Sequence, residues 1–123
     1  MTFRYQAWES VPLEPMSDVI SRKLFSGERA MVAQVFFKKG AVVPEHQHDN
    51  EQITYILKGA LKFQLQGREV VVREGEVLHI PSNVPHRAVA LEETLDLDIF
   101  SPPRADWLRK DDEYLRRGEQ EQV

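Results

Sequence analysis

The central part of the chain is divided by glycines into short segments of similar length. Gly59, Gly67 and Gly75 lie at equal spacing. Between the first two, residues 60–65 alternate apolar and polar side chains, as in a strand with one buried and one wet face. Residues 69–73, between the second two, are rich in valine and also favour a strand. Short strands between evenly spaced turn glycines predict an all-β sandwich or barrel.

The same pattern extends over most of the chain. Further strand-like runs occupy residues 19–25, 30–38, 51–58, 77–80, 87–90 and 94–100. Consecutive prolines end the last of them. The apolar pair Trp107 and Leu108 is then repeated two helical turns later by a second aromatic–leucine pair. We therefore predict one or two short helices over residues 104–117, packed on the barrel through Trp107 and Leu108.

Length and composition limit the classes of protein to consider. The chain has 123 residues, which favours one domain over residues 1–123 with a single core. A net charge of −4 at pH 7 gives no reason to expect a nucleic-acid partner. No apolar run is long enough to span a bilayer, and no secretory leader is apparent, so we expect no membrane partner and a cytoplasmic protein. The absence of cysteine excludes disulfides and thiolate ligands.

Three of the four histidines fall into a pattern with one glutamine. Side chains two residues apart on a strand share a face, so one extended segment is expected to aim His46, His48 and Gln52 at one point. His86 would join them from another strand, whereas His79 lies outside the pattern. Three imidazoles and one oxygen suit a divalent transition metal (Fe, Mn, Ni or Zn) and leave coordination positions open for reaction.

This pattern resembles the two sequence motifs of the cupin family. Five residues between 40 and 59 fill positions of the first motif: Gly40, His46, His48, Gln52 and Gly59. Three residues between 75 and 90 fill positions of the second: Gly75, Pro81 and His86. Asn83 and Ala90 stand where the motif usually has Gly and Asn. The resemblance implies a cupin β-barrel, a jelly-roll sandwich of two antiparallel sheets, with the metal held inside by the three histidines and Gln52.

Gln52 departs from the usual motif, because most cupins have Glu at this position. A neutral amide leaves the charge of the metal uncompensated, which makes the ion a stronger Lewis acid or favours an anionic substrate or a nearby carboxylate. The alternative interpretation is that Gln52 weakens the site until no metal binds.

Residues 98–108 resemble the corresponding segment of small pectin-degradation cupins of the KdgF type, which linearise 4,5-unsaturated uronates. The resemblance implies that Asp98, Phe100 and Arg104 line the pocket. Asp98 would act as general acid and base, Phe100 would form a wall, and Arg104 would bind a substrate carboxylate. Asp96 and Asp98 alternate with apolar residues, so periodicity alone is equally compatible with both carboxylates lying in solvent.

Three functions remain open from the sequence. The first is a metal-dependent enzyme that opens and tautomerises 4,5-unsaturated uronates, with a small carboxylate as substrate. The second is a metal-dependent dioxygenase of a small organic substrate, and the third is a non-catalytic cupin that binds a small ligand. We also expect a homodimer, since small sandwiches have open edges and apolar outer faces. Phe3, Tyr5 and Trp8 are candidates for its interface, or else pack internally.

Overall fold

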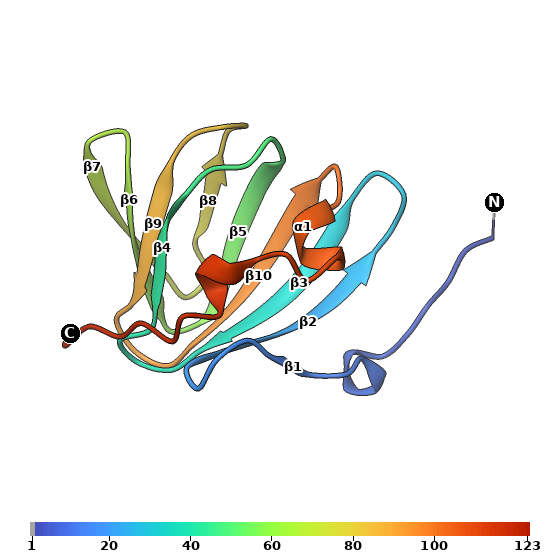
Figure 1. Ribbon diagram of the computed structural model, residues 1–123, viewed down its shortest axis with the longest axis horizontal. Coiled ribbons are helices and arrows are strands. Elements are labelled where there is room, and N and C mark those ends of the chain that lie inside the picture. Colours follow the sequence, from blue (N-terminus) through green and yellow to red (C-terminus); the bar gives the residue numbers. More distant parts are fainter. Residues whose placement is uncertain (1) are drawn as a thin grey trace.

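The computed structural model, which describes residues 2–123, consists of two antiparallel sheets that face each other (Figure 1). The larger sheet has six strands, in the order β1 (Glu14–Pro15), β2 (Ile20–Ser26), β3 (Met31–Phe37), β10 (Thr94–Ser101), β5 (Glu51–Lys58) and β8 (Val77–Ile80). The smaller sheet has four, in the order β4 (Val42–His46), β9 (His86–Ala90), β6 (Ala60–Leu65) and β7 (Arg68–Arg73). The predicted all-β sandwich of two antiparallel sheets is confirmed.

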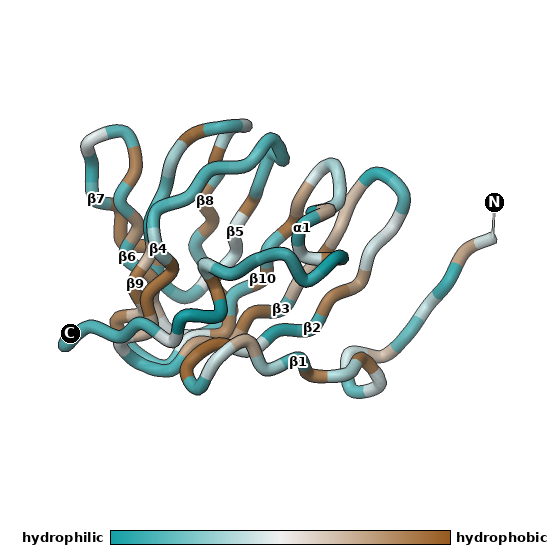
Figure 2. The backbone as a smooth tube through the Cα atoms, viewed as in Figure 1, coloured by the Kyte–Doolittle hydropathy of each residue, from teal (hydrophilic) through white to brown (hydrophobic). Residues whose placement is uncertain are grey.

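The core lies between the two sheets. Strand β3 alternates strictly, with every second residue from Met31 to Phe37 buried. Leu61 and Phe63 of β6 oppose it from the smaller sheet. Figure 2 shows apolar stretches along the strands, whereas the connecting loops and the C-terminal tail are mostly hydrophilic. Burial of this apolar surface, at roughly 25 cal/mol per Å², is the main driving force that holds the sheets together.

Strand β10 lies between β3 and β5 and has an unusual distribution of polarity. Its inward residues are buried and include two acids: Thr94, Asp96, Asp98 and Phe100. The leucines and the isoleucine between them form the outer face instead. The structure therefore selects one of the two orientations that the sequence left open, and it places both carboxyl groups inside the barrel.

The C-terminal tail folds back over the sheets in short helices, as predicted. Helix α1 (Ala105–Leu108) is followed by the 3-10 helix η2 (Glu113–Leu115). Trp107 is buried and packs on the barrel, but Leu108 is 53% exposed, so its predicted packing is wrong. Helix α1 is a single turn, and consecutive side chains on one turn point in different directions. Leu115, from η2, takes the buried position instead.

A buried ion pair fixes the tail to the larger sheet. Arg22 of β2 is fully buried, forms an ion pair with Asp112, and holds its guanidinium 4.6 Å from the Trp107 ring. Glu14 of β1 binds the same arginine at 3.0 Å. Arg116 completes the network by pairing with both acids, and Asp112 lies four residues before it in the tail.

The N-terminal segment runs away from the barrel (Figure 1). It leads into a 3-10 helix, η1 (Trp8–Ser10), before β1. Phe3 and Tyr5 are 86% and 91% exposed, so internal packing of these two rings is not observed, whereas Trp8 is half-buried. Within the described residues no helix is long and apolar enough to cross a membrane.

Candidate metal centre and active site

Three histidines converge at one end of the barrel. His46 ends β4, His86 begins β9 as its cross-strand partner, and His48 lies in the loop between β4 and β5. One ring nitrogen from each lies within 4.8 Å of the others. The expectation that His46, His48 and Gln52 share one extended strand is wrong, because the chain passes from the smaller sheet to the larger sheet between them. The convergence expected from that strand is nevertheless present.

The backbone fixes which nitrogen each histidine offers. In all three rings Nδ1 contacts a backbone carbonyl oxygen, at 2.9 Å for His46, 3.0 Å for His48 and 2.8 Å for His86. A carbonyl only accepts, so Nδ1 carries the hydrogen and Nε2 keeps its lone pair. Such contacts orient metal-binding histidines. Nε2 of His86 is buried without a partner among residues 2–123, as expected of a ligand atom.

Burial keeps these imidazoles neutral. It lowers the pKa of His46 to about 3, with a further contribution from His86. Burial, together with the positive charge of Arg104, lowers the pKa of His48 to about 4. The pKa of His86 is lowered as well, again mainly by burial. Neutral imidazole is the form that binds a metal ion, so at neutral pH all three histidines are in the protonation state that metal binding requires.

Gln52, on β5, directs its amide oxygen toward the histidines. Its Nε2 donates to Thr54 Oγ1 at 2.9 Å, and Thr54 in turn donates to Asp98 Oδ1 at 2.7 Å. Because threonine has one hydroxyl hydrogen and gives it to Asp98, it can only accept from Gln52. This chain fixes the amide orientation and leaves Oε1 at 3.1 Å from His48 Nε2.

Two lone pairs therefore face each other across the contact between Gln52 and His48. Neither Oε1 nor the neutral Nε2 of His48 carries a hydrogen, and such a contact is favourable when both atoms bind the same cation. Together with the orphaned Nε2 of His86, it fits a divalent transition metal held by the three histidines and Gln52.

Asp98 lies beside this cluster in a largely apolar interior. It is 5% exposed, and Gln52 Nε2 lies 3.4 Å from its Oδ1. Burial raises the pKa of Asp98, although the hydrogen bonds from its neighbours act against this. A buried carboxyl group next to a metal site is a suitable group for moving protons.

Phe100 and Arg104 complete the wall between the barrel and the tail. The Phe100 ring meets His48 edge-on at 5.8 Å between centroids. Arg104 is 1% exposed and lies 5.0 Å from the Phe100 ring. Its Nε and Nη2 bind Asp106 at 3.0 and 2.8 Å, and Nη2 also donates to Tyr114. Among residues 2–123 no hydrogen-bond partner is found for its Nη1.

A sequence model of the family described as "Cupin domain" matches residues 33–101. The chain belongs to the cupin family. The pectin degradation protein KdgF of Dickeya dadantii (strain 3937) is 34% identical over 108 residues, which cover 85% of this chain and 98% of that protein.

Two solved cupin structures have the same fold over most of the chain. The structure of KdgF from Halomonas sp. has a TM-score of 0.81 at 32% identity, and covers 86% of this cupin and 99% of that chain. An RmlC-like cupin from Shewanella frigidimarina NCIMB 400 has a TM-score of 0.80 at 25% identity, with coverage of 86% and 96%. The resemblance to small KdgF-type cupins, read from short motifs, therefore extends over nearly the whole chain.

Several residues of the site in this cupin were not found from its sequence. Thr54 links Gln52 to Asp98, but a threonine in a strand is too common to give a signal. Tyr114 stacks on His46 with 4.3 Å between centroids, whereas the sequence indicated only a helical repeat there. Asp106, two residues after Arg104, was the one available hint that the arginine has a partner within the chain.

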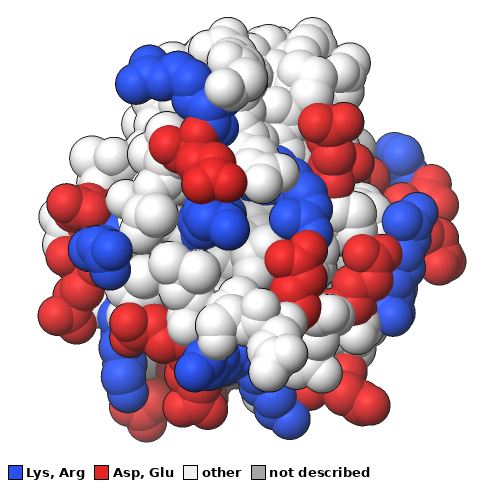
Figure 3. Space-filling view, turned by 90° about the vertical axis from the view of Figure 1, so that its left-hand side faces the viewer, with Lys and Arg blue, Asp and Glu red and all other residues white. Residues whose placement is uncertain are grey.

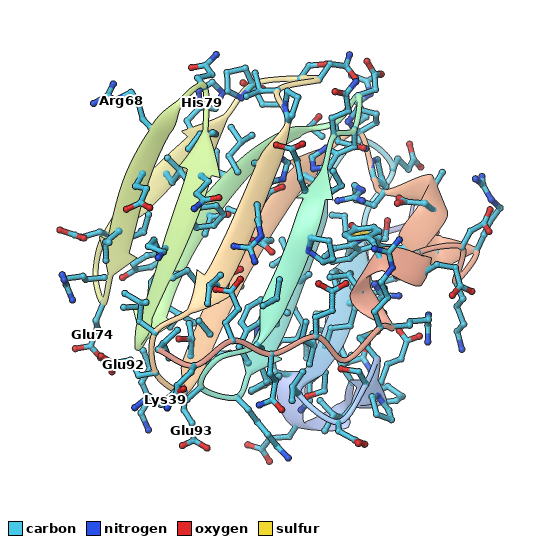
Figure 4. The ribbon with its side chains drawn as sticks, turned by 60° about the vertical axis from the view of Figure 1, so that its left-hand side comes forward. Lys39, Arg68, Glu74, His79, Glu92 and Glu93 are labelled. Carbon is cyan, nitrogen blue, oxygen red and sulfur yellow. The ribbon has the colours of Figure 1, made fainter. Side chains whose placement is uncertain are left out.

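His79 lies apart from the cluster, at the edge of the molecule in Figure 4. Its Nε2 contacts Glu51 Oε2 at 2.7 Å, and both side chains are more than half exposed.

The interior cavity lies between the sheets and has a volume of about 40 Å³. It is lined on its polar side by His46, His86, Gln52, Asp96, Asp98 and Arg104. A cavity of this size has room for only a few water molecules.

Proposed function

We propose that this cupin is a metal-dependent enzyme that opens and tautomerises 4,5-unsaturated uronates. The hydrogen-bonded chain from Gln52 through Thr54 to Asp98 is the observation that carries the proposal, because it joins a candidate metal ligand to a buried acid. The relative from Dickeya dadantii, named as a pectin degradation protein, supports the substrate class, since pectin is built from uronates.

A divalent transition metal (Fe, Mn, Ni or Zn) would be held by Nε2 of His46, His48 and His86 and by Oε1 of Gln52. When bound, it supplies a Lewis acid that polarises an oxygen of the substrate. Because the amide adds no negative charge, the site keeps a net positive charge that favours an anionic substrate.

Three side chains would carry out proton transfer, binding of the substrate carboxylate and orientation of the sugar ring. Asp98 transfers a proton to or from the substrate during ring opening and tautomerisation. Arg104 binds the substrate carboxylate through Nη1, the nitrogen that Asp106 and Tyr114 leave free, and its position is fixed by those two partners. Phe100 forms an apolar wall that orients the ring and limits access of water.

Substrate binding requires a change in the tail. A uronate is larger than a cavity of about 40 Å³, and Trp107, Tyr114 and Leu115 of the tail line that cavity. In the proposed reaction these side chains move aside as the substrate reaches the histidines.

The first experiment measures metal content and turnover together. The protein is purified without added metal, its bound metals are identified by mass spectrometry, and the loss of absorbance of 4,5-unsaturated galacturonate is followed. Turnover that tracks metal content and is lost in Asp98→Asn supports the proposal. The control is Asp111→Asn, since the Asp111 side chain is 73% exposed on the tail. Bound metal without turnover of the uronate contradicts it, and oxygen consumption would then indicate the dioxygenase.

We also propose that the protein is a homodimer formed through the outer face of the larger sheet. The outer face of the smaller sheet carries many charged side chains of both signs (Figure 3). On the larger sheet, by contrast, Ile53, Tyr55, Val77 and Ile99 are 42%, 37%, 67% and 37% exposed. They form one patch, because Ile53 pairs with Ile99 and Tyr55 with Val77 across adjacent strands. A second copy would cover this patch and the exposed rings of the N-terminal segment.

A further inference from the structure

Asp96 is a buried acid to which the proposed reaction assigns no role. It lies two residues before Asp98 on the inward face of β10 and is 2% exposed. Its cross-strand neighbours are Val35 on β3 and Ile56 on β5, which are both buried and apolar. Its Oδ1 has no hydrogen-bond partner among residues 2–123. An ionised carboxylate in such a position would be strongly destabilising.

Asp96 and Asp98 lie two residues apart on the same inward face of β10, and both line the interior cavity. Two ionised carboxylates so close together in a buried site repel each other, so this arrangement favours protonation of one of the two groups. Asp98 already accepts from Thr54 at 2.7 Å and lies near the amide of Gln52, whereas Oδ1 of Asp96 has no hydrogen-bond partner among the described residues. The proton is therefore more stable on Asp96. Burial, followed by the negative charge of Asp98, raises the pKa of Asp96 well above its usual range.

The register of the sheet separates the roles of the two acids. On β5, Gln52 lies opposite Phe100, Thr54 lies opposite Asp98, and Ile56 lies opposite Asp96. Asp96 is thus farther along β10 from the histidines than Asp98, behind it in an apolar layer. Asp96 can contact the Asp98 carboxyl group from the side away from the histidines, and Asp98 remains the acid adjacent to the histidine cluster.

We propose that Asp96 is a positioning residue, a neutral carboxylic acid that donates a hydrogen bond to Asp98 and fixes its orientation toward the histidines. The proposal rests on the proposed function, in which Asp98 transfers the proton. Thr54 donates a hydrogen bond to Asp98 from the neighbouring strand, and in this proposal Asp96 donates a second one from the same strand. With both contacts in place the Asp98 carboxylate has one preferred orientation, as proton transfer requires.

An infrared measurement tests the protonation without any substrate. The carbonyl stretch of a protonated carboxylic acid lies apart from the amide bands, and it is recorded at neutral pH for the metal-loaded protein and two variants. We expect this band to be lost in Asp96→Asn and to remain in Asp98→Asn. A band that remains in Asp96→Asn and disappears in Asp98→Asn would place the proton on Asp98 and overturn the proposal. The absence of this band from the unmodified protein would also overturn it.

Turnover tests the positioning role. Asparagine at position 96 keeps a donor for Asp98, whereas leucine fits the apolar surroundings and donates nothing. In variants with equal metal content, we expect kcat of Asp96→Leu to lie at least about tenfold below that of Asp96→Asn, with KM changed less than about twofold. Equal kcat values in the two variants would contradict the proposal. If the unmodified protein does not act on the uronate, the proposed function fails, and the infrared comparison still decides the state of Asp96.

Discussion

Gln52 Oε1 lies 3.1 Å from His48 Nε2, while the other end of the same amide donates to Thr54 at 2.9 Å. One side chain thus belongs both to the candidate metal cluster and to the hydrogen-bonded chain that ends on Asp98. An amide suits both tasks, since it offers an oxygen at one end and a donor at the other. A glutamate could supply the oxygen but not the donor, and its charge would lie close to the buried Asp98.

Replacing Gln52 with glutamate should therefore strengthen metal binding and weaken catalysis. The added carboxylate compensates the charge of the metal, so we expect a lower Kd, measured by competition with a chromophoric chelator. Its negative charge near Asp98 raises the pKa of that acid further and removes a donor, so kcat should fall by about tenfold to a hundredfold.

The matched control for Gln52→Glu is Gln64→Glu, which makes the same change in charge at an exposed position on β6. We expect it to leave both Kd and kcat unchanged. Equal metal affinity in Gln52→Glu and in the unmodified protein would mean that Gln52 is not a ligand.

The histidine cluster should make the metal-free protein less stable in acid. The pKa of His46 is about 3 in the folded protein, against the ordinary value of 6.5 that the imidazole regains when the chain unfolds. Between these values the unfolded chain binds a proton that the folded chain does not, so the free energy of unfolding falls as the pH drops below 6.5. The effect is at most about 1.4 kcal/mol per pH unit for one imidazole.

The acids Asp96 and Asp98 act in the opposite direction, since their pKa values are raised and their protonation in acid favours the folded state. The contribution of the histidine is isolated by comparing the unmodified protein with His46→Gln, both free of metal. Thermal unfolding between about pH 7 and pH 5 should show a smaller loss of Tm in the variant. Parallel Tm curves would show that His46 is not held neutral by the fold.

The sequence was most informative where local chemistry determines structure. Turn glycines bound the strands, and the predicted ranges 51–58, 60–65 and 77–80 agree with β5, β6 and β8. The candidate metal ligands could be predicted because their spacing forms a motif. The prediction that His46, His48 and Gln52 share one strand was wrong, because the alternation of side chains along a strand does not reveal where the chain passes from one sheet to the other.

Other features depend on long-range packing and were not predictable from one sequence. The alternation in 94–100 fits either orientation, and Asp98 points inward because the apolar residues of β10 form the outer face of the larger sheet. The hydrogen bond from Arg104 to Tyr114, and the stacking of Tyr114 on His46, arise from the path of the tail. That path follows no periodicity that a sequence pattern could reveal.

Changing Arg104 to lysine should impair substrate binding more than catalysis. Lysine keeps the positive charge but loses the planar fork that binds Asp106 and leaves Nη1 free. We expect KM for the uronate to rise by about tenfold, with a smaller change in kcat. The control is Arg116→Lys, since Arg116 pairs with Glu14 and Asp112 away from the cavity. An unchanged KM in Arg104→Lys would exclude Arg104 as the carboxylate-binding residue.

A glutamate on the outer face of the larger sheet should dissociate the proposed dimer. In Tyr55→Glu or Ile99→Glu a charge is introduced into the apolar patch, and burying it unpaired in an interface is costly by several kcal/mol. Size-exclusion chromatography with light scattering should then show a dimer for the unmodified protein and a monomer for either variant, with the barrel still folded. Leu108→Glu is the matched control, because Leu108 is an exposed apolar residue on the tail, outside the patch. A monomeric unmodified protein at every concentration, or dissociation by Leu108→Glu as well, would show that this face is not the interface.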